Sequence, residues 1–345
     1  MTPPVPQALQ PLLMPFAWLY RWLVVFRRWA LEGGLLTSVR LPGKVISVGN
    51  LQVGGTGKSP VVQDLAAWLL RQGARPAILA RGYRSGLHRR DSMAFLGEGI
   101  IMSPVTPGED TADEARMLAR ALSNVPVIIG ARRGEAARRY LQKYSAPTHW
   151  ILDDGFQHMQ ISRDLDILLL DGRDPLGGSR LLPAGILREP PGAIRSADVI
   201  LLTRSPDGAG AAEKVRPWLR SPDTPLIPLT FRNGPLQWRA GPNTLPETGA
   251  PVLLVSAIAG PADFEAGVRA TGLRIVHHLR LRDHSELDPA KIADMTASCT
   301  AIVTTEKDFW RNPRVFKYSK KPVCTLPLHT GLSDEMIRQI LDPLI

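Results

Sequence analysis

The sequence has few of the residues that stabilise small secreted proteins or bind structural metals. Among its 345 residues are two cysteines, Cys299 and Cys324, each within an apolar run that predicts a strand. Neither belongs to a CxxC pair or to the Cys/His spacing of a zinc site. A disulfide framework is therefore excluded, and we expect two reduced core thiols in a cytosolic protein.

The sequence also lacks the features of a nucleic-acid-binding protein, although its formal net charge is +10. A positive charge indicates an acidic partner, which is nucleic acid, an anionic membrane or a phosphorylated substrate. The chain contains no DNA-reading motif and no basic stripe interleaved with aromatic residues, the pattern that favours single-stranded nucleic acid. We therefore expect no nucleic-acid partner, and nothing in the sequence implies an obligate protein partner.

The amino-terminal segment has no uncharged run of about 20 apolar residues, the length needed to cross a bilayer. Residues 11–31, PLLMPFAWLYRWLVVFRRWAL, are mostly apolar but contain Arg21, Arg27 and Arg28. A secretory signal is disfavoured, because no Lys or Arg precedes the apolar region and no small-residue cleavage pattern follows it. We expect residues 1–31 to form a membrane-interfacial helix, with tryptophans at the headgroup level and arginines reaching lipid phosphates. The alternative is a helix packed on the protein's own core. The tryptophans are Trp18, Trp22 and Trp29.

A glycine-rich segment follows the apolar run at 44–48 and precedes a helix-like stretch at 61–70. This segment, GNLQVGGTGKS at 49–59, has the strand–loop–helix context of a phosphate-binding loop. Lys58 is expected to reach the β/γ-phosphates of a nucleotide, and the Ser59 hydroxyl to bind Mg2+. The residues predicted to bind the nucleotide are Gly54, Gly55, Thr56, Gly57, Lys58 and Ser59.

This phosphate loop is irregular. The usual spacing places a glycine five residues before Gly57, where this chain has Gln52, so only the Gly-Gly-x-Gly-Lys-Ser half of the pattern is present. A tight structural turn is the alternative interpretation, but the lysine, the hydroxyl and the strand-to-helix context favour phosphate binding.

Short apolar runs alternate with amphipathic stretches from residue 44 onward. The alternation predicts an α/β fold: a P-loop-type parallel-sheet domain at 32–222, with helices on both faces near 60–72, 110–122 and 131–144. Residues 223–250 are rich in Pro and Gly, and we expect a linker with a hairpin at Asn233-Gly234. A second, smaller α/β domain should cover 251–345, with helices near 262–271 and 333–342. The predicted strands are Val45–Gly49, Pro76–Ala80, Val127–Gly130, Trp150–Asp153, Asp166–Asp171, Val199–Thr203, Val252–Ser256, Arg274–His277, Ala301–Thr304 and Val323–Thr325.

Acidic residues at the end of one predicted strand suit a metal site. Asp153 and Asp154 follow a buried run, which is the usual position of a carboxylate that holds Mg2+ beside a phosphate loop. From spacing alone, Asp113 and Glu114 are typical of a helix first turn. His284 alone has the character of a surface residue.

Seven segments together resemble the tetraacyldisaccharide 4'-kinase family of lipid A biosynthesis. They occur in the family's order between residues 49 and 308, and the irregular loop is itself part of the resemblance. The segments are GNLQVGGTGKSP at 49–60, ARGYRSG at 80–86, ADEA at 112–115, DDGFQH at 153–158, LLPAGILREP at 181–190, RDH at 282–284 and TTEKD at 304–308.

The resemblance implies transfer of the γ-phosphate of ATP to the 4'-hydroxyl of a tetraacyldisaccharide 1-phosphate, giving lipid IVA. The glycolipid substrate would be met at the cytoplasmic face of the bacterial inner membrane, where the enzyme would be peripheral. By position, Asp113 looks like the base, with His284 as its partner, and Lys58 would cradle the transferring phosphate. Ser59, Asp153, Asp154 and Glu189 would hold Mg2+, and Arg81, Gly82, Tyr83 and Arg188 would line the substrate or nucleotide cleft.

One segment departs from the family pattern. Many members have Gly-Asp-Glu-Pro where this chain has Ala-Asp-Glu-Ala at 112–115, so the choice of Asp113 over Glu114 as the base is open. Two other functions also remain open. A partitioning-type ATPase switch shares the Gly-Gly-x-Gly-Lys-Ser loop, but such switches carry a lysine where this chain has Val53. A small-molecule kinase would have its N-terminal helix packed on the core.

Overall fold

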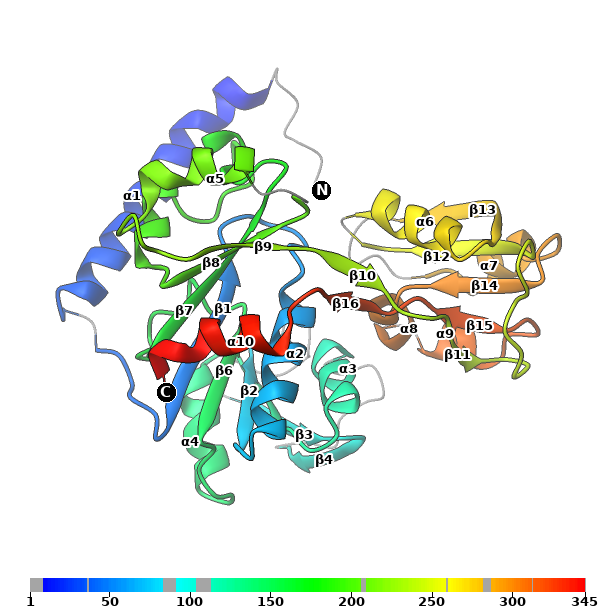
Figure 1. Ribbon diagram of the computed structural model, residues 1–345, viewed down its shortest axis with the longest axis horizontal. Coiled ribbons are helices and arrows are strands. Elements are labelled where there is room, and N and C mark those ends of the chain that lie inside the picture. The colour runs from blue at the N-terminus through cyan, green and yellow to red at the C-terminus, as the bar shows by residue number, and fades with distance from the viewer. Residues whose placement is uncertain are drawn as a thin grey trace. The chain divides into compact units, whose positions relative to one another are not determined.

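The computed structural model of the chain divides into two compact units (Figure 1). It describes residues 9–35, 37–82, 91–103, 113–205, 209–258, 260–281, 287–311 and 313–344, apart from the side chains of Glu32, Asp113 and Glu114. The larger unit contains residues up to Phe231 together with Thr330–Ile345, and the smaller unit contains Arg232–His329.

The larger unit is built on a nine-stranded sheet with the order β4-β3-β5-β2-β6-β1-β7-β8-β9. All neighbours from β5 to β9 are parallel, whereas β3 and β4 join one edge as antiparallel strands. The central strands are buried on both faces, which explains their continuous apolar sequences. The strands are β1 (Lys44–Asn50), β2 (Pro76–Ala80), β3 (Ser92–Leu96), β4 (Gly99–Met102), β5 (Val127–Gly130), β6 (His149–Asp153), β7 (Leu165–Asp171), β8 (Val199–Thr203) and β9 (Leu226–Leu229).

Helices cover both faces of this sheet, as the sequence predicts. Alternate strand residues pack against α2 (Lys58–Arg71), α3 (Asp113–Ala121) and α10 (Asp334–Leu341) on one face. The strand residues that point to the other face pack against α4 (Arg133–Leu141) toward one edge of the sheet and against α5 (Ala209–Val215) toward the other edge. A mixed α/β fold with a large parallel sheet is thus confirmed.

The smaller unit has a five-stranded sheet with the order β11-β15-β14-β12-β13. Only β11 is antiparallel to its neighbour in this sheet. Both cysteines are free and buried here, as predicted. The strands are β11 (Gln237–Ala240), β12 (Pro251–Ser256), β13 (Arg274–Arg280), β14 (Ala301–Thr304) and β15 (Val323–Thr325), and the helices are α6 (Pro261–Ala270), α7 (Pro289–Met295), α8 (Glu306–Arg311) and α9 (Pro313–Lys317).

The boundary between the units differs from the expected one in two respects. The predicted hairpin at Asn233-Gly234 does not form, because β10 (Phe231–Asn233) pairs with β16 (Leu328–Thr330) and β11 pairs with β15. The chain then returns to the larger unit, where α10 buries apolar side chains against α2. Residues 330–345 therefore do not belong with the rest of the predicted 251–345 domain.

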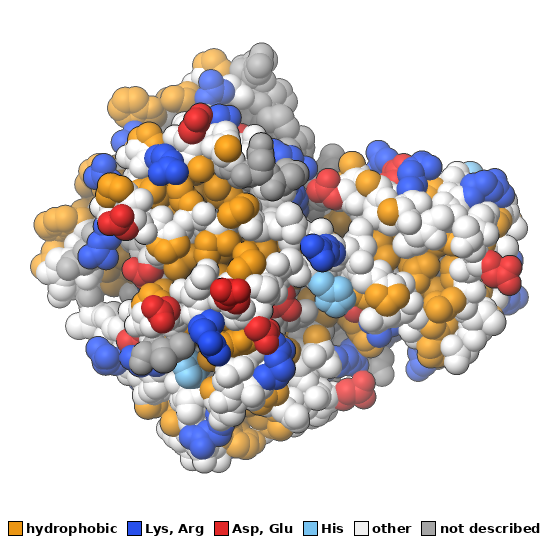
Figure 2. All heavy atoms as spheres, in the orientation of Figure 1, with side chains coloured by type: hydrophobic (Ala, Val, Ile, Leu, Met, Phe, Trp, Pro, Cys, Tyr) orange, Lys and Arg blue, Asp and Glu red, His pale blue; other side chains and the backbone are white. Residues whose placement is uncertain are grey.

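The amino-terminal helix α1 (Gln10–Glu32) belongs to the larger unit. A narrow stripe that includes Ala17 and Tyr20 faces the unit, while large apolar side chains on the other sides stay exposed. Figure 2 shows hydrophobic side chains, with Lys and Arg among them, along the edge where Figure 1 draws α1. Within the described part of the chain, no helix has the length and apolarity needed to span a membrane. The most exposed large apolar side chains of α1 are Leu12, Phe16, Trp18, Leu19, Trp22 and Trp29.

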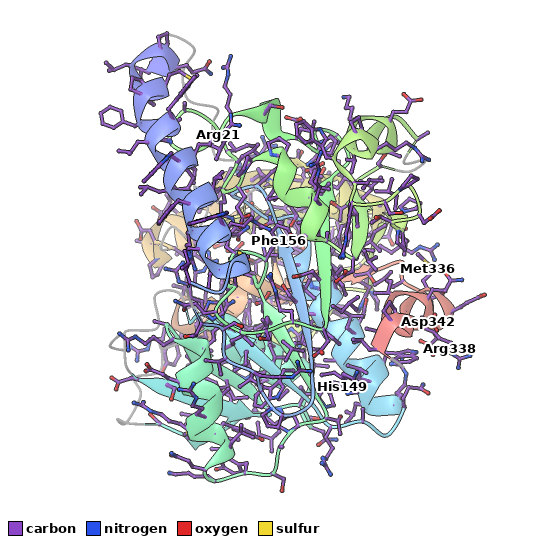
Figure 3. All side chains as sticks on the ribbon, turned by 90° about the vertical axis from the view of Figure 1, so that its left-hand side faces the viewer. Arg21, His149, Phe156, Met336, Arg338 and Asp342 are labelled. Carbon is purple, nitrogen blue, oxygen red and sulfur yellow. The ribbon has the colours of Figure 1, made fainter. Side chains whose placement is uncertain are left out.

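The return of α10 to the larger unit makes its apolar face a test of the fold. Ile337 is 2% exposed, so Ile337→Ala should lower the free energy of unfolding of the larger unit by about 2–5 kcal/mol. Arg338, which is exposed on the same helix and labelled in Figure 3, provides the control. Arg338→Ala should change the free energy of unfolding by less than about 0.5 kcal/mol. Calorimetric unfolding of the full chain measures both; equal effects would place α10 outside the core.

Candidate active site

The glycine-rich loop joins β1 to α2 at the carboxyl edge of the parallel sheet, where ligands of such sheets bind. Gly57 caps α2 with a left-handed φ of 87°, and a Cβ at this position would lie 2.1 Å from the Phe231 ring. Only glycine fits here. Lys58 and Ser59 form the first turn of α2, where free N–H groups and the positive end of the helix dipole attract anions.

The irregular position in the loop, Gln52, has a structural explanation. Gln52 forms an antiparallel bridge with Leu187, and the Val53 N–H donates to the Ile186 carbonyl at 2.8 Å. The Gln52 side-chain amide donates to the Asp174 carbonyl at 2.5 Å. The first half of the loop is therefore short strand-like backbone paired with the LLPAGILREP segment, so no glycine is needed at position 52.

Asp154 is the centre of the described charges beside the loop. Its carboxylate accepts two hydrogen bonds from the Arg188 guanidinium, at 2.8 and 2.9 Å, and lies 3.4 Å from the Lys58 Nζ. Its backbone adopts a left-handed φ of 51°, which is uncommon for a residue other than glycine. The structure thus brings three predicted site residues together.

These contacts set the charge state of the cluster. Burial alone would raise the pKa of the Asp154 carboxyl, but Lys58 and Arg188 overcome this effect and hold that pKa well below its usual range. Burial also lowers the pKa of the Lys58 ammonium, against the opposing attraction of Asp154. Asp154 is therefore ionised and stabilises the cations that face the loop.

Glu189, a predicted metal ligand, lies beside α1. Its side chain is 5% exposed and forms an ion pair with Arg28 of α1. The Tyr20 hydroxyl of the same helix donates to the Arg188 carbonyl at 2.9 Å. Arg28, which we expected at a membrane surface, is thus paired within the protein, because Glu189 supplies the partner that a buried arginine needs.

The predicted metal ligands are only partly assembled. Asp153 is the last residue of β6, and Asp154 follows it at the same sheet edge. Among the residues that the structure describes, no group of three or more His, Cys, Asp or Glu side chains lies close enough together to hold a metal ion. The set of Ser59, Asp153, Asp154 and Glu189 stays a prediction.

Four residues of this region were not singled out from the sequence. Asn50 is fully buried, accepts from Arg188 through its side chain and accepts from the Gln157 amide at 2.8 Å through its carbonyl. Arg133 is 2% exposed and donates to the Asp154 carbonyl at 3.1 Å. Burial, aided by nearby arginines that include Arg133, lowers the pKa of His158 to about 3. Asn50, Gln157 and His158 lie inside the family-like segments, which could have indicated them.

Other predicted residues are placed in part or lie outside the described residues. Arg81 is exposed near His158, whose pKa it lowers, and Gly82 has a left-handed φ of 69°. Tyr83, His284 and the side chain of Asp113 lie outside the described residues. Asp113 is the first residue of α3 in the larger unit, as its place in a helix first turn predicts.

Comparisons with known proteins all indicate the same family. The family model for tetraacyldisaccharide-1-P 4'-kinase (LpxK) matches residues 9–345. A tetraacyldisaccharide 4'-kinase from Pelobacter propionicus is 36% identical over 310 residues, which are 88% of this chain and 83% of the relative. One from Anaeromyxobacter dehalogenans is 37% identical over 290 residues, or 80% and 74% of the two chains.

A solved structure gives the same result. The crystal structure of LpxK from Aquifex aeolicus in complex with ATP matches with a TM-score of 0.72 and 28% sequence identity. The match covers 96% of this chain and 99% of that one. The extent of these matches, which include the glycine-rich loop and the Asp154 carboxylate with its two cations, shows that the chain belongs to the tetraacyldisaccharide-1-P 4'-kinase family and is a phosphotransferase with an alcohol acceptor.

Proposed function

We propose that this chain transfers the γ-phosphate of ATP to the 4'-hydroxyl of tetraacyldisaccharide 1-phosphate, giving lipid IVA, at the cytoplasmic face of the inner membrane. The observation that carries the proposal is that Lys58 and Arg188 both pair with the Asp154 carboxylate beside the glycine-rich loop. Two fixed cations and a helix N-terminus provide the charge neutralisation on which phosphoryl transfer depends.

The phosphate-binding role belongs to residues 54–59. Gly54 and Gly55 leave room for a ligand's phosphates, since a Cβ at either position would meet nothing within 4 Å. Lys58 exchanges part of its attraction to Asp154 for the β/γ-phosphates when the nucleotide binds. Its lowered pKa rises again beside those anions, so the ammonium stays charged during transfer.

The donor set fits magnesium, which favours carboxylate and hydroxyl oxygens. Ser59, Asp153, Asp154 and Glu189 would hold the ion, which when bound neutralises charge on the β- and γ-phosphate oxygens. Asp154 pairs with Arg188, and Glu189 pairs with Arg28. Lys58 and Arg188 keep the Asp154 carboxylate ionised, and therefore competent as a ligand. Each arginine would give up part of its contact with its carboxylate when the ion binds.

The acceptor hydroxyl is activated by Asp113. Its carboxylate takes the proton of the 4'-hydroxyl as the oxygen bonds to the γ-phosphorus and the bond to the ADP oxygen breaks, and His284 orients that carboxylate. Both assignments come from the family resemblance. Arg81, Gly82, Tyr83 and Arg188 are assigned to the cleft. Arg81 lies in a group of arginines around a neutral His158, which leaves positive charge for the phosphate of the glycolipid.

The exposed side of α1 is the membrane contact. Trp18, Trp22 and Trp29 are 71%, 62% and 58% exposed, and Arg21 and Arg27 are exposed among them. Figure 3 shows Arg21 on this helix. A surface of aromatic, aliphatic and cationic side chains matches the headgroup region of an anionic bilayer. A substrate with four acyl chains then stays in the membrane while it is phosphorylated.

The first test is transfer of label from γ-labelled ATP to the 1-phosphorylated tetraacyl disaccharide in mixed micelles with Mg2+. Lys58→Ala should lower labelled lipid by roughly 100-fold or more, because it removes a fixed cation from the transferring group. Lys44→Ala, at the exposed start of β1, should have little effect. Phosphate released to water with no labelled lipid would instead indicate the ATPase switch.

Replacement of the proposed base tests the mechanism. Asp113→Ala should lower turnover by about 10²–10⁴-fold while the affinity for ATP changes little, because the carboxylate acts on the acceptor. Glu114→Ala is the matched variant. Steady-state kinetics with both substrates varied separates kcat from the KM for ATP. A larger loss of turnover in Glu114→Ala than in Asp113→Ala would assign the base to Glu114.

The membrane contact can be tested without removing α1. The double variant Trp18→Ser/Trp22→Ser should bind anionic phospholipid vesicles at least about tenfold more weakly, because each exposed ring contributes about 1.5 kcal/mol or more on burial. Trp238→Ser in the smaller unit controls for loss of a surface tryptophan. Unchanged sedimentation of the double variant, with Tm preserved, would remove the membrane role from this surface.

A further inference from the structure

A side chain outside the family-like segments holds the middle of the phosphate loop. Arg204 follows β8, and its guanidinium donates to the Gly55 carbonyl at 2.7 Å and to the Asp171 carboxylate at 2.9 Å. The backbone of Arg204 has a left-handed φ of 57°, which is uncommon for a residue with a side chain. Such a conformation persists only where the surrounding contacts require it.

The contact fixes the direction of a loop N–H group. The Gly55 carbonyl and the Thr56 N–H belong to one planar trans peptide unit, so they point in opposite directions. With the carbonyl turned toward Arg204, the Thr56 N–H is turned to the other side of the backbone, away from the guanidinium. Loops of this kind bind phosphate by turning N–H groups toward the anion, and this requires the carbonyls to point outward.

The loop has a second contact at this point, a long hydrogen bond at 3.4 Å that the Asn50 amide donates to the Gly54 carbonyl. A Cβ at Gly54 or Gly55 would meet nothing within 4 Å, so that side of each residue is open. Val53 is held by Ile186 on one side, and Gly57 lies against the Phe231 ring on the other. The hydroxyl of Thr56 is buried and has no hydrogen-bond partner among the described residues, which leaves it available to a ligand in the loop.

Arg204 is itself held by a fixed anion. Burial would raise the pKa of the Asp171 carboxyl, but Arg173 and Arg204 overcome this and lower it, so Asp171 stays ionised. Arg173 donates to this carboxylate from its backbone N–H at 3.1 Å and from its side chain at 3.0 and 2.9 Å. The Gly172 N–H also donates to the Thr203 carbonyl at 2.6 Å, which joins the ends of β7 and β8.

We propose that Arg204 is a positioning residue that pre-orients the phosphate loop for the β-phosphate of the nucleotide. The inference rests on the proposed function, because it takes the loop to be the nucleotide site. Arg204 acts through the Gly55 peptide unit, and Asp171 anchors it. The consequence is selective: ligands with a β-phosphate gain affinity from Arg204, while a nucleoside monophosphate gains little.

The test is calorimetric binding of ADP, inorganic pyrophosphate and AMP to the full chain. Arg204→Gln should weaken the binding of ADP and pyrophosphate by about tenfold and leave that of AMP unchanged, and KM for ATP should rise with little change in kcat. Arg204→Lys, which keeps one charge but loses the two-ended guanidinium, should give an intermediate loss. Arg173→Gln is the matched control, because it removes a guanidinium from Asp171 and leaves the Gly55 contact in place.

Several outcomes would overturn the inference. Unchanged ADP binding in Arg204→Gln would show that the contact is dispensable, and an equal loss for AMP would assign Arg204 to the nucleoside. An equal loss in Arg173→Gln would show that only the Asp171 cluster matters. If the intact chain binds ADP but makes no labelled lipid, the proposed function fails and this inference stands. If it binds neither ADP nor pyrophosphate, both fail.

Discussion

The ionised carboxylate of Asp154 is the contact on which the arrangement of the site depends. It pairs with Lys58 at the start of α2 and with Arg188 in the LLPAGILREP segment. The backbone carbonyl of Asp154 also accepts a hydrogen bond from Arg133 of α4. Hydrogen bonds to charged groups contribute about 1.5–3 kcal/mol each, enough to offset the roughly 1–3 kcal/mol cost of a left-handed backbone. Loss of the carboxylate would leave partly buried cations without their anion, a far larger cost than loss of a surface ion pair.

The amino-terminal helix is part of this same assembly. Arg28 contacts Glu189, a proposed metal ligand, and Tyr20 contacts Arg188, which pairs with Asp154. The opposite sides of α1 expose large apolar side chains. One element thus combines exposed apolar side chains with contacts to Arg188 and Glu189. The choice between a membrane helix and a core helix was therefore too simple, since one stripe of α1 packs and the rest is exposed.

The fold was largely predictable where strands are buried on both faces. Pro76–Ala80, Val127–Gly130 and Val199–Thr203 coincide with β2, β5 and β8, because a parallel strand between two helical layers needs a continuous apolar run. The edge strands β3 and β4 and the short strand β16 were not predicted. The β3 and β4 sequences, SMAFL and GIIM, are as apolar as that of β5, so apolarity did not set them apart as strands. What makes these segments strands is pairing with partners that the sequence does not indicate. For the same reason, the turn signal at Asn233-Gly234 was taken for a hairpin.

At the site, the sequence by itself determined the chemistry. The glycines, Lys58 and the two aspartates follow strands whose carboxyl ends must meet at one sheet edge, so local patterns were sufficient to place them together. Only the tertiary structure decided the partners. Arg28 and Glu189 are 161 residues apart, and Arg204 and Gly55 are 149 apart. α10 returns to the larger unit because its apolar face is buried there. A charged side chain or an apolar face specifies only that a partner is needed, and long-range packing of the folded chain selects which one.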